Sequence, residues 1–163
     1  MQNNIQQHGE FQRRAIHSRM GSHHGHHLRE EMISIARSYL GVPFVHRGRS
    51  MRGVDCVGLL YVVFNDFFNI QDPQNYSIFV PTMKSFMMIR QYADRININD
   101  VKPADIVLMC NDKNSAHYGL VIGDTVTHAD QLVGKVIEHN FKSLIDGKSK
   151  RRAVAFFRMK GLA

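Results

Sequence analysis

The residues best suited to chemistry are Asp55 and Cys56, which stand directly before the apolar run of residues 59–64. An aspartate in this position is a good helix N-cap, because its carboxylate can accept hydrogen bonds from free amides of the first turn. Cys56 would then lie where unpaired N–H groups and the helix dipole favour an anion, so we expect its thiol to ionise readily. A thiolate there could act as a nucleophile, with the same amides steadying an oxyanion. These residues alone are equally compatible with a small buried cysteine at a helix start.

Two histidines downstream strengthen the catalytic interpretation. His117 begins an apolar strand in which it shares one face with Gly119 and Val121. A glycine leaves room for another element to approach, so we expect the cysteine helix to pack on this face and bring imidazole and thiol together. A short turn would make the next strand a neighbour, and its His128 could then reach the far nitrogen of His117. We therefore predict a nucleophile, a base and an orienting residue in Cys56, His117 and His128.

Helices are predicted on both sides of the cysteine segment. Apolar residues recur at helical spacing from Leu28 onward, and Gly41 and Pro43 end this first helix. The cysteine helix, apolar all round and so expected to be buried, should end near Phe68, before a connecting loop over residues 69–81. A further amphipathic helix is predicted with its apolar positions at Phe86, Ile89, Ala93 and Ile96.

From Asp105 onward the pattern changes to short strands separated by turns that contain glycine or aspartate. These strands are predicted over residues 105–110, 116–123, 126–130, 135–141 and 153–158. Helices followed by antiparallel strands indicate an α+β domain, with N-terminal helices packed on an antiparallel sheet of about five strands.

Length and composition indicate one globular domain with a real core, since the chain has 163 residues of which 44% are hydrophobic. Its two cysteines, Cys56 and Cys110, are expected to be free thiols in a reducing compartment. The net charge of +7 favours anionic partners, but no zinc finger, basic zipper or RNA-binding aromatic motif accompanies it, so no nucleic-acid partner is predicted. No apolar run is long enough for a membrane span, and the N-terminus lacks the apolar region of a Sec signal peptide.

The first 27 residues are polar and hold six of the ten histidines. They lack acidic or cysteine partners at metal-ligand spacing, so we predict no metal site, and nothing elsewhere indicates a cofactor. Such a composition is typical of a flexible arm. We therefore divide the chain into an arm over residues 1–27 and a domain over residues 28–163.

Arginines crowd the loop that leads to the cysteine helix, at Arg47, Arg49 and Arg52. They could be solvated, or they could bind carboxylates through their planar forks. The basic run at residues 148–152 is more simply a solvated loop.

Taken in order, these motifs resemble the NlpC family of papain-like cysteine peptidases, particularly the forms found in phage tails and related particles. The shared features are a helix ending in Leu-Gly, a Pro-aromatic loop, an Asp-Cys-x-Gly helix start, a Pro-x-Asp-Ile strand, a His-x-Gly strand and a His-Ala strand. They stand at residues 39–41, 43–48, 55–58, 103–107, 117–121 and 128–129. The resemblance covers residues 28 to about 158.

The resemblance implies that Cys56 is the nucleophile, His117 the base and His128 the orienting third residue. It also implies hydrolysis of a peptide bond in bacterial peptidoglycan, usually between D-glutamate and diaminopimelate. His46 stands where many members have a tyrosine near the oxyanion site. Val57 replaces a serine that, together with the preceding aspartate (here Asp55), helps some relatives to bind a free substrate amine.

Stem peptides are rich in carboxylates, so the arginines at positions 47, 49 and 52 are candidates to bind them. We predict a cell-wall hydrolase carried by a phage-like tail, assembled in the bacterial cytoplasm and acting at the wall, with residues 1–27 docking on another tail protein. Two alternatives stay open: a structural tail-tip subunit with a vestigial site, and an amidase or acyltransferase on the same fold.

Overall fold

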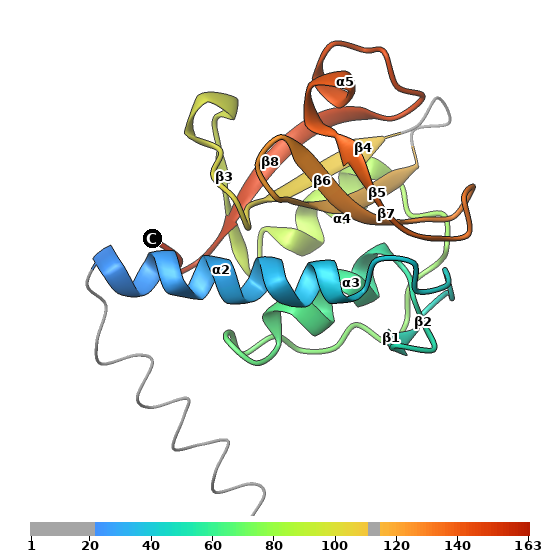
Figure 1. Ribbon diagram of the computed structural model, residues 1–163. Coiled ribbons are helices and arrows are strands. Elements are labelled where there is room, and N and C mark those ends of the chain that lie inside the picture. Colours follow the sequence, from blue (N-terminus) through green and yellow to red (C-terminus); the bar gives the residue numbers. More distant parts are fainter. Residues whose placement is uncertain (1–21, 111–114) are drawn as a thin grey trace, which may run out of the picture.

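The computed structural model of the chain describes residues 22–110 and 115–163 (Figure 1). Its helices are α2 (Ser22–Ser38), α3 (Cys56–Phe64), α4 (Thr82–Ile89), the 3₁₀ turn η1 (Ile98–Asp100) and α5 (Phe141–Ile145). Its strands are β1 (Arg49–Ser50), β2 (Gly53–Val54), β3 (Ala93–Ile96), β4 (Ile106–Cys110), β5 (Ala116–Val121), β6 (Thr125–Asp130), β7 (Lys135–Asn140) and β8 (Arg152–Met159).

The main sheet has six strands in the order β3-β8-β4-β5-β6-β7, and every neighbouring pair is antiparallel. Figure 1 shows α2 and α3 together on one side of this sheet, with α5 at the opposite side. The small β1–β2 hairpin lies in the loop that leads into α3. The prediction of an α+β domain with N-terminal helices on an antiparallel sheet is therefore confirmed.

The predicted helix through Ile96 is wrong in its second half. Helix α4 ends at Ile89, and Ala93 and Ile96 belong to strand β3, which pairs with β8. A sheet edge offers unpaired N–H and C=O groups, and β3 supplies partners to that edge of β8. This pairing is non-local, so the weak helical spacing of these residues did not reveal it. The predicted strand ending at residue 141 also stops earlier, because the Asn140 side chain accepts the Ser143 N–H and caps α5.

Helix α2 begins at Ser22, six residues before the predicted start of the domain, so the last part of the predicted arm is helical. His26 lies 3.4 Å from Glu30 and His27 lies 3.2 Å from Glu31, pairs one helical turn apart on an exposed surface. The remainder of the predicted arm, residues 1–21, lies outside the described residues. Within residues 22–110 and 115–163 no group of three His, Cys, Asp or Glu side chains could hold a metal ion, and no helix is long and apolar enough to cross a membrane.

The core consists of two layers, one on each face of the sheet. Alternate residues of a strand point to opposite faces, so Leu108 and Leu120 join the cluster under α2 and α3. Val107 and Val126 instead join the cluster that contains Leu144 of α5. The cysteine helix is thus supported along one side by the sheet, which fixes the position of its N-terminus.

A buried ion-pair cluster fastens α2 to the sheet. Asp105 is fully buried, and its carboxylate lies 3.1 Å from Arg29 Nη1 of α2 and 2.6 Å from Arg158 Nη2 of β8. Removing one partner of such a cluster typically costs about 3–5 kcal/mol, because a buried charge is left uncompensated. Asp105 therefore serves the fold rather than the chemistry.

Candidate active site

Asp55 caps the cysteine helix, as its position before the apolar run predicts. Its Oδ1 accepts the Gly58 N–H at 2.7 Å, and its backbone is extended, so Cys56 is the first residue of α3. Gly58 is required here, because a Cβ at this position would lie 2.1 Å from the Gly48 carbonyl oxygen. The loop containing Gly48 therefore packs directly on the first turn that carries the thiol.

The Asp55 carboxylate is also the centre of a hydrogen-bond cluster. Besides the helix amide, its Oδ2 accepts the Tyr76 hydroxyl at 2.6 Å, the Arg47 N–H at 2.7 Å and Nδ1 of His46 at 3.2 Å. Four protein donors thus contact this carboxylate, three of them at Oδ2, and Arg49 Nη1 lies 3.6 Å from Oδ1. Asp55 is only 2% exposed, so little of the carboxylate is accessible to a ligand. Its role is to hold the cap, the loop and His46 in place.

The arginine loop is tied to residues 72–76. Arg49 donates to the Asp72 carboxylate, to the Pro73 carbonyl and to the Tyr76 hydroxyl, at 2.9 to 3.1 Å. Arg47 donates from Nε and Nη2 to the Tyr76 carbonyl. Arg49 in particular presents no free fork to a ligand, whereas Arg52 lies exposed at the β1–β2 turn. The structure thus gives Arg47 and Arg49 a local role, holding the 72–76 segment against the helix start.

The two strand histidines meet within hydrogen-bond distance. Nε2 of His117 lies 2.8 Å from Nδ1 of His128, and the two residues are 5% and 0% exposed, respectively. The β5–β6 register pairs Leu120 with Thr127, which places the two histidines diagonally on the same face of the sheet. The predicted contact of His128 with the far nitrogen of His117 is therefore present.

The way in which the cysteine helix approaches them differs from the expectation. The space beside Gly119 is filled by Val126 and Met109, so α3 does not pack on that face. Helix α3 packs instead on the face of β5 that carries Tyr118 and Leu120. The pairing of β5 with β6 stops at Leu120 and Thr127, so the residues of β5 before Leu120 have no partner in β6. In this part of β5 the Tyr118 N–H lies next to the thiol. Cys56 thus reaches β5 at the residue adjacent to His117.

The thiol is less acidic than its place at a helix N-terminus suggests. Burial raises the pKa of Cys56 to about 11; the Tyr118 N–H opposes this rise and the Asp55 carboxylate adds to it. The sequence-based expectation of a readily ionised thiol is therefore wrong for the free protein, because desolvation outweighs the helix terminus. Burial also lowers the pKa of His117 well below 6.5 and that of His128 to about 4. Thiol and imidazole are both neutral at rest, so a base must take the proton as the sulfur reacts.

The hydrogen bond between the histidines determines which nitrogen can be that base. If Nε2 of His117 donates to Nδ1 of His128, then Nδ1 of His117 carries the free lone pair. This arrangement puts the proton of His128 on its Nε2, which is buried without a hydrogen-bond partner among the described residues. Leaving such a donor unpaired costs about 1–3 kcal/mol. We expect the hydrogen bond to His128 to persist despite this cost, because it orients the His117 imidazole.

Two charged residues near this pair were not singled out from the sequence. Asp130 Oδ2 lies 3.9 Å from Nδ1 of His128 and 3.2 Å from Nε of Arg151. Arg151 was expected to be solvated, but its side chain is only 11% exposed, and its charge lowers the pKa of both histidines. The alternation of β6 could have revealed Asp130, since residues two apart on a strand share a face. Nothing local marks Arg151.

A small cleft of about 30 Å³ lies beside the thiol, and His46, Cys56 and Tyr76 line it together. The His46 ring stands edge-on to Tyr76, with ring centroids 5.2 Å apart, and its side chain is 30% exposed. His46, which the family resemblance puts near the oxyanion position, thus lines the same cleft as the thiol.

Alkylation by iodoacetamide tests the protonation state of the thiol. Because the thiolate is the nucleophile and the pKa of Cys56 is near 11, we expect its rate to rise about tenfold per pH unit between pH 8 and 10. A thiolate already formed at rest would instead show a flat rate above pH 7. Measured by mass spectrometry, Cys56 should also react well before Cys110, which is 1% exposed. Equal labelling of both cysteines would contradict the assignment of Cys56 as the nucleophile.

The site combines a thiol at the start of a helix with a pair of histidines on adjacent strands of an α+β domain. The family model for the NlpC/P60 family matches residues 41–153, more than half of the chain. The chain therefore belongs to the NlpC/P60 family.

Solved structures of family members share this fold. The NlpC/p60 domain of the peptidoglycan hydrolase SagA is 17% identical, with 80% of this chain and 98% of that chain covered and a TM-score of 0.59. The peptidoglycan hydrolase RipB from Mycobacterium tuberculosis is 19% identical, with coverages of 90% and 70% and a TM-score of 0.61. RipD from the same organism, described as a non-catalytic protein adapted to peptidoglycan binding, is 12% identical, with coverages of 83% and 98% and a TM-score of 0.55. None of the curated proteins matches the chain.

Proposed function

We propose that this protein is a cysteine peptidase that hydrolyses the stem peptides of bacterial peptidoglycan. The observation that carries the proposal is the 2.8 Å contact between His117 and His128 beside the helix start that carries Cys56. A structural subunit with a vestigial site would have no chemical need for this set of residues. Membership of the NlpC/P60 family, which contains the hydrolases SagA and RipB, supports the same conclusion.

The proposed reaction follows from the neutral resting state. The Cys56 sulfur attacks the carbonyl carbon of the peptide bond while Nδ1 of His117 takes the thiol proton, and His128 stabilises the resulting imidazolium. The tetrahedral intermediate collapses to a thioester, and the leaving amine takes its proton from His117. Water then attacks the thioester with His117 again as base, which releases the acid and restores the thiol. Free amides at the start of α3 are donors for the oxyanion.

His46 can assist the oxyanion in one protonation state only. The Asp55 carboxylate can only accept, so Nδ1 of His46 carries a hydrogen, and a neutral His46 has a lone pair at Nε2. Donation to an oxyanion therefore requires the imidazolium form. Many family members have a tyrosine at this position, and its hydroxyl would donate a hydrogen bond at any pH below about 10.

Kinetics of His46 variants test this role. We expect H46A, which carries no donor, to lower kcat on sacculi about a hundredfold, as the loss of one oxyanion donor typically does. H46Q and H46Y each carry a donor group and should retain more activity than H46A. Equal kcat values for the wild type and H46A would exclude His46 as the donor.

Within this activity we propose the bond between D-glutamate and diaminopimelate as the target. The test is mass spectrometry of purified sacculi after incubation with the protein, with C56A as the control. Fragments with a new diaminopimelate amine, absent with C56A, support the proposal. Fragments with only a freed L-alanine amine would mean an amidase, and no fragments from a protein whose Cys56 reacts with iodoacetamide would favour a structural or acyl-transfer role.

We further propose that the hydrolase is carried by a phage-like tail, assembled in the bacterial cytoplasm and acting at the cell wall. The support is the resemblance of the sequence motifs to tail-borne forms. Docking is assigned to residues 1–27, of which 22–27 are part of α2 and so belong to the folded domain. Deleting residues 1–21 should therefore leave sacculus hydrolysis intact but reduce the protein found in purified particles. Normal incorporation of the deletion variant would refute docking through this segment.

A further inference from the structure

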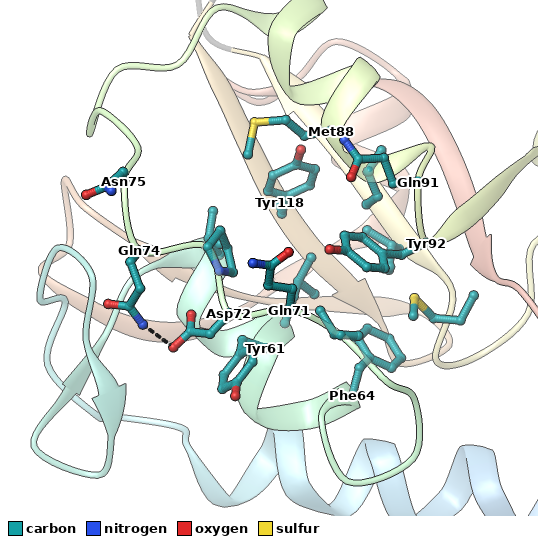
Figure 2. Close-up of a pocket in the computed structure, with 17 residues that line it drawn as sticks. Tyr61, Phe64, Gln71, Asp72, Gln74, Asn75, Met88, Gln91, Tyr92 and Tyr118 are labelled. Carbon is teal, nitrogen blue, oxygen red and sulfur yellow. Dashed lines mark hydrogen bonds between the residues drawn. The ribbon is translucent and has the colours of Figure 1, made fainter.

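A second, much larger cavity lies beside the cysteine helix. It has a volume of about 440 Å³, within the range of small-molecule sites, and is formed by α3, the segment 70–75, the end of α4 and the sheet (Figure 2). Val57 and Tyr118 line both this cavity and the small cleft that holds the thiol. The two spaces are therefore neighbours, separated by these two side chains.

This cavity explains why the cysteine helix is apolar all round. Leu59 and Val63, both fully buried, belong to the core. The opposite stripe consists of residues at positions i, i+3, i+4 and i+7, and all of them line the cavity. They are Val57, Leu60, Tyr61 and Phe64. Leu60 and Phe64 also belong to the core, so the stripe packs on protein and borders the cavity with an apolar surface that is suited to binding a ligand.

The walls opposite α3 are also apolar or uncharged. Met88 and Ile89 at the end of α4, and Ile106 and Met159 of the sheet, continue the apolar surface. Amide and phenol groups stand among them, and Figure 2 shows the Gln71 side chain between those of Tyr61 and Tyr118. These groups can orient a ligand without requiring that it be charged.

Charge complementarity excludes an ionic ligand. Asp72 is the only charged side chain in the lining, and its Oδ1 accepts from Arg49 Nε at 2.9 Å while its Oδ2 accepts from Gln74. The carboxylate is thus neutralised, and moving a charged group into an apolar cavity without a partner is costly. Peptidoglycan stems, rich in carboxylates, fit this cavity poorly.

We propose that this cavity is a binding site for an uncharged aliphatic chain, such as that of a medium-length alcohol or acyl amide, and that its occupancy restrains Cys56. The coupling has a physical basis in two places. Val57 follows Cys56 in the first turn of α3, and the Tyr118 N–H lies next to the thiol, so a ligand that presses on either side chain bears on the nucleophile. The evidence for this site does not depend on the reaction proposed above.

The test uses the neutral fluorescent probe N-phenyl-1-naphthylamine and the competitor decan-1-ol. We expect the probe to bind the full-length wild type with enhanced emission and decan-1-ol to displace it. Q71W should weaken binding at least tenfold, because Gln71 is an exposed residue whose side chain lines the cavity. A tryptophan there would fill the cavity without replacing a core residue. The matched control is M87W, on the 63% exposed side chain of α4 outside the cavity, which should bind as the wild type does.

The coupling has its own readout, the alkylation of Cys56 by iodoacetamide. Saturating decan-1-ol should slow it several-fold in the wild type and in M87W, but not in Q71W. Equal probe binding by wild type and Q71W would overturn the site, and alkylation unaffected by a displacing concentration of decan-1-ol would overturn the coupling. Neither measurement uses sacculi, so a failure of the proposed hydrolase activity would leave this result interpretable.

Discussion

Replacing Cys56 or His117 with alanine should abolish sacculus hydrolysis, with a loss in kcat on the order of 10⁴-fold or more. The thiol forms the covalent bond to the substrate. In the proposed reaction His117 is the base, since it is the histidine next to Tyr118, whose N–H lies beside the thiol. The rate of release of soluble fragments measures the loss. Circular dichroism should show an unchanged fold, because C56A removes only a sulfur atom.

H128A should reduce sacculus hydrolysis without abolishing it. In the proposed reaction His128 orients His117 and stabilises its charged form, so its loss should be roughly a hundredfold milder than that of the nucleophile, as for orienting residues in other triads. C110A is the matched control for thiol chemistry, since Cys110 is buried in β4 and should be dispensable. A fully active H128A would transfer the orienting role to His139, whose ring stacks on His128 at 5.8 Å.

The second large effect is expected at Asp55, where alanine should damage both stability and activity. D55A removes the cap of α3 and leaves buried donors of Tyr76 and Arg47 without an acceptor. Each unpaired donor costs about 1–3 kcal/mol, and the lost cap costs about 1 kcal/mol. The free energy of unfolding should therefore fall by about 3 kcal/mol or more. Urea unfolding measures this change. Activity should also fall steeply, because the helix start that positions the thiol loses its anchor.

Two companion variants separate the causes. D55N keeps a capping oxygen but presents an amide to donors, so it should retain part of the stability while losing the His46 contact. D72A breaks the other carboxylate contact of Arg49 at a partly exposed position, and should cost no more than about 1 kcal/mol. A D55A protein as stable as D72A would show that the carboxylate cluster does not support the helix start.

The sequence by itself determined the features that rest on neighbouring residues. Asp55 before an apolar run is sufficient to predict a capped helix with Cys56 in its first turn, because capping involves only residues three positions apart. The alternation of β5 and β6 and the turn between them likewise place His117 and His128 within reach, since a hairpin fixes its own register. These local rules supplied the order of most elements and the histidine pair.

Only the tertiary structure decided the features that depend on distant segments. Strand β3 forms because β8 offers a sheet edge with which it can pair. The donors of Arg49 bind Asp72 and Tyr76, and the residues next to Arg49 in the sequence do not indicate either partner. The pKa of Cys56 is raised because burial, a property of the whole packing arrangement, outweighs the helix terminus that the sequence reveals. The large cavity beside α3 exists for the same reason: periodicity shows that a stripe is apolar, but only packing decides whether protein or open space lies against it.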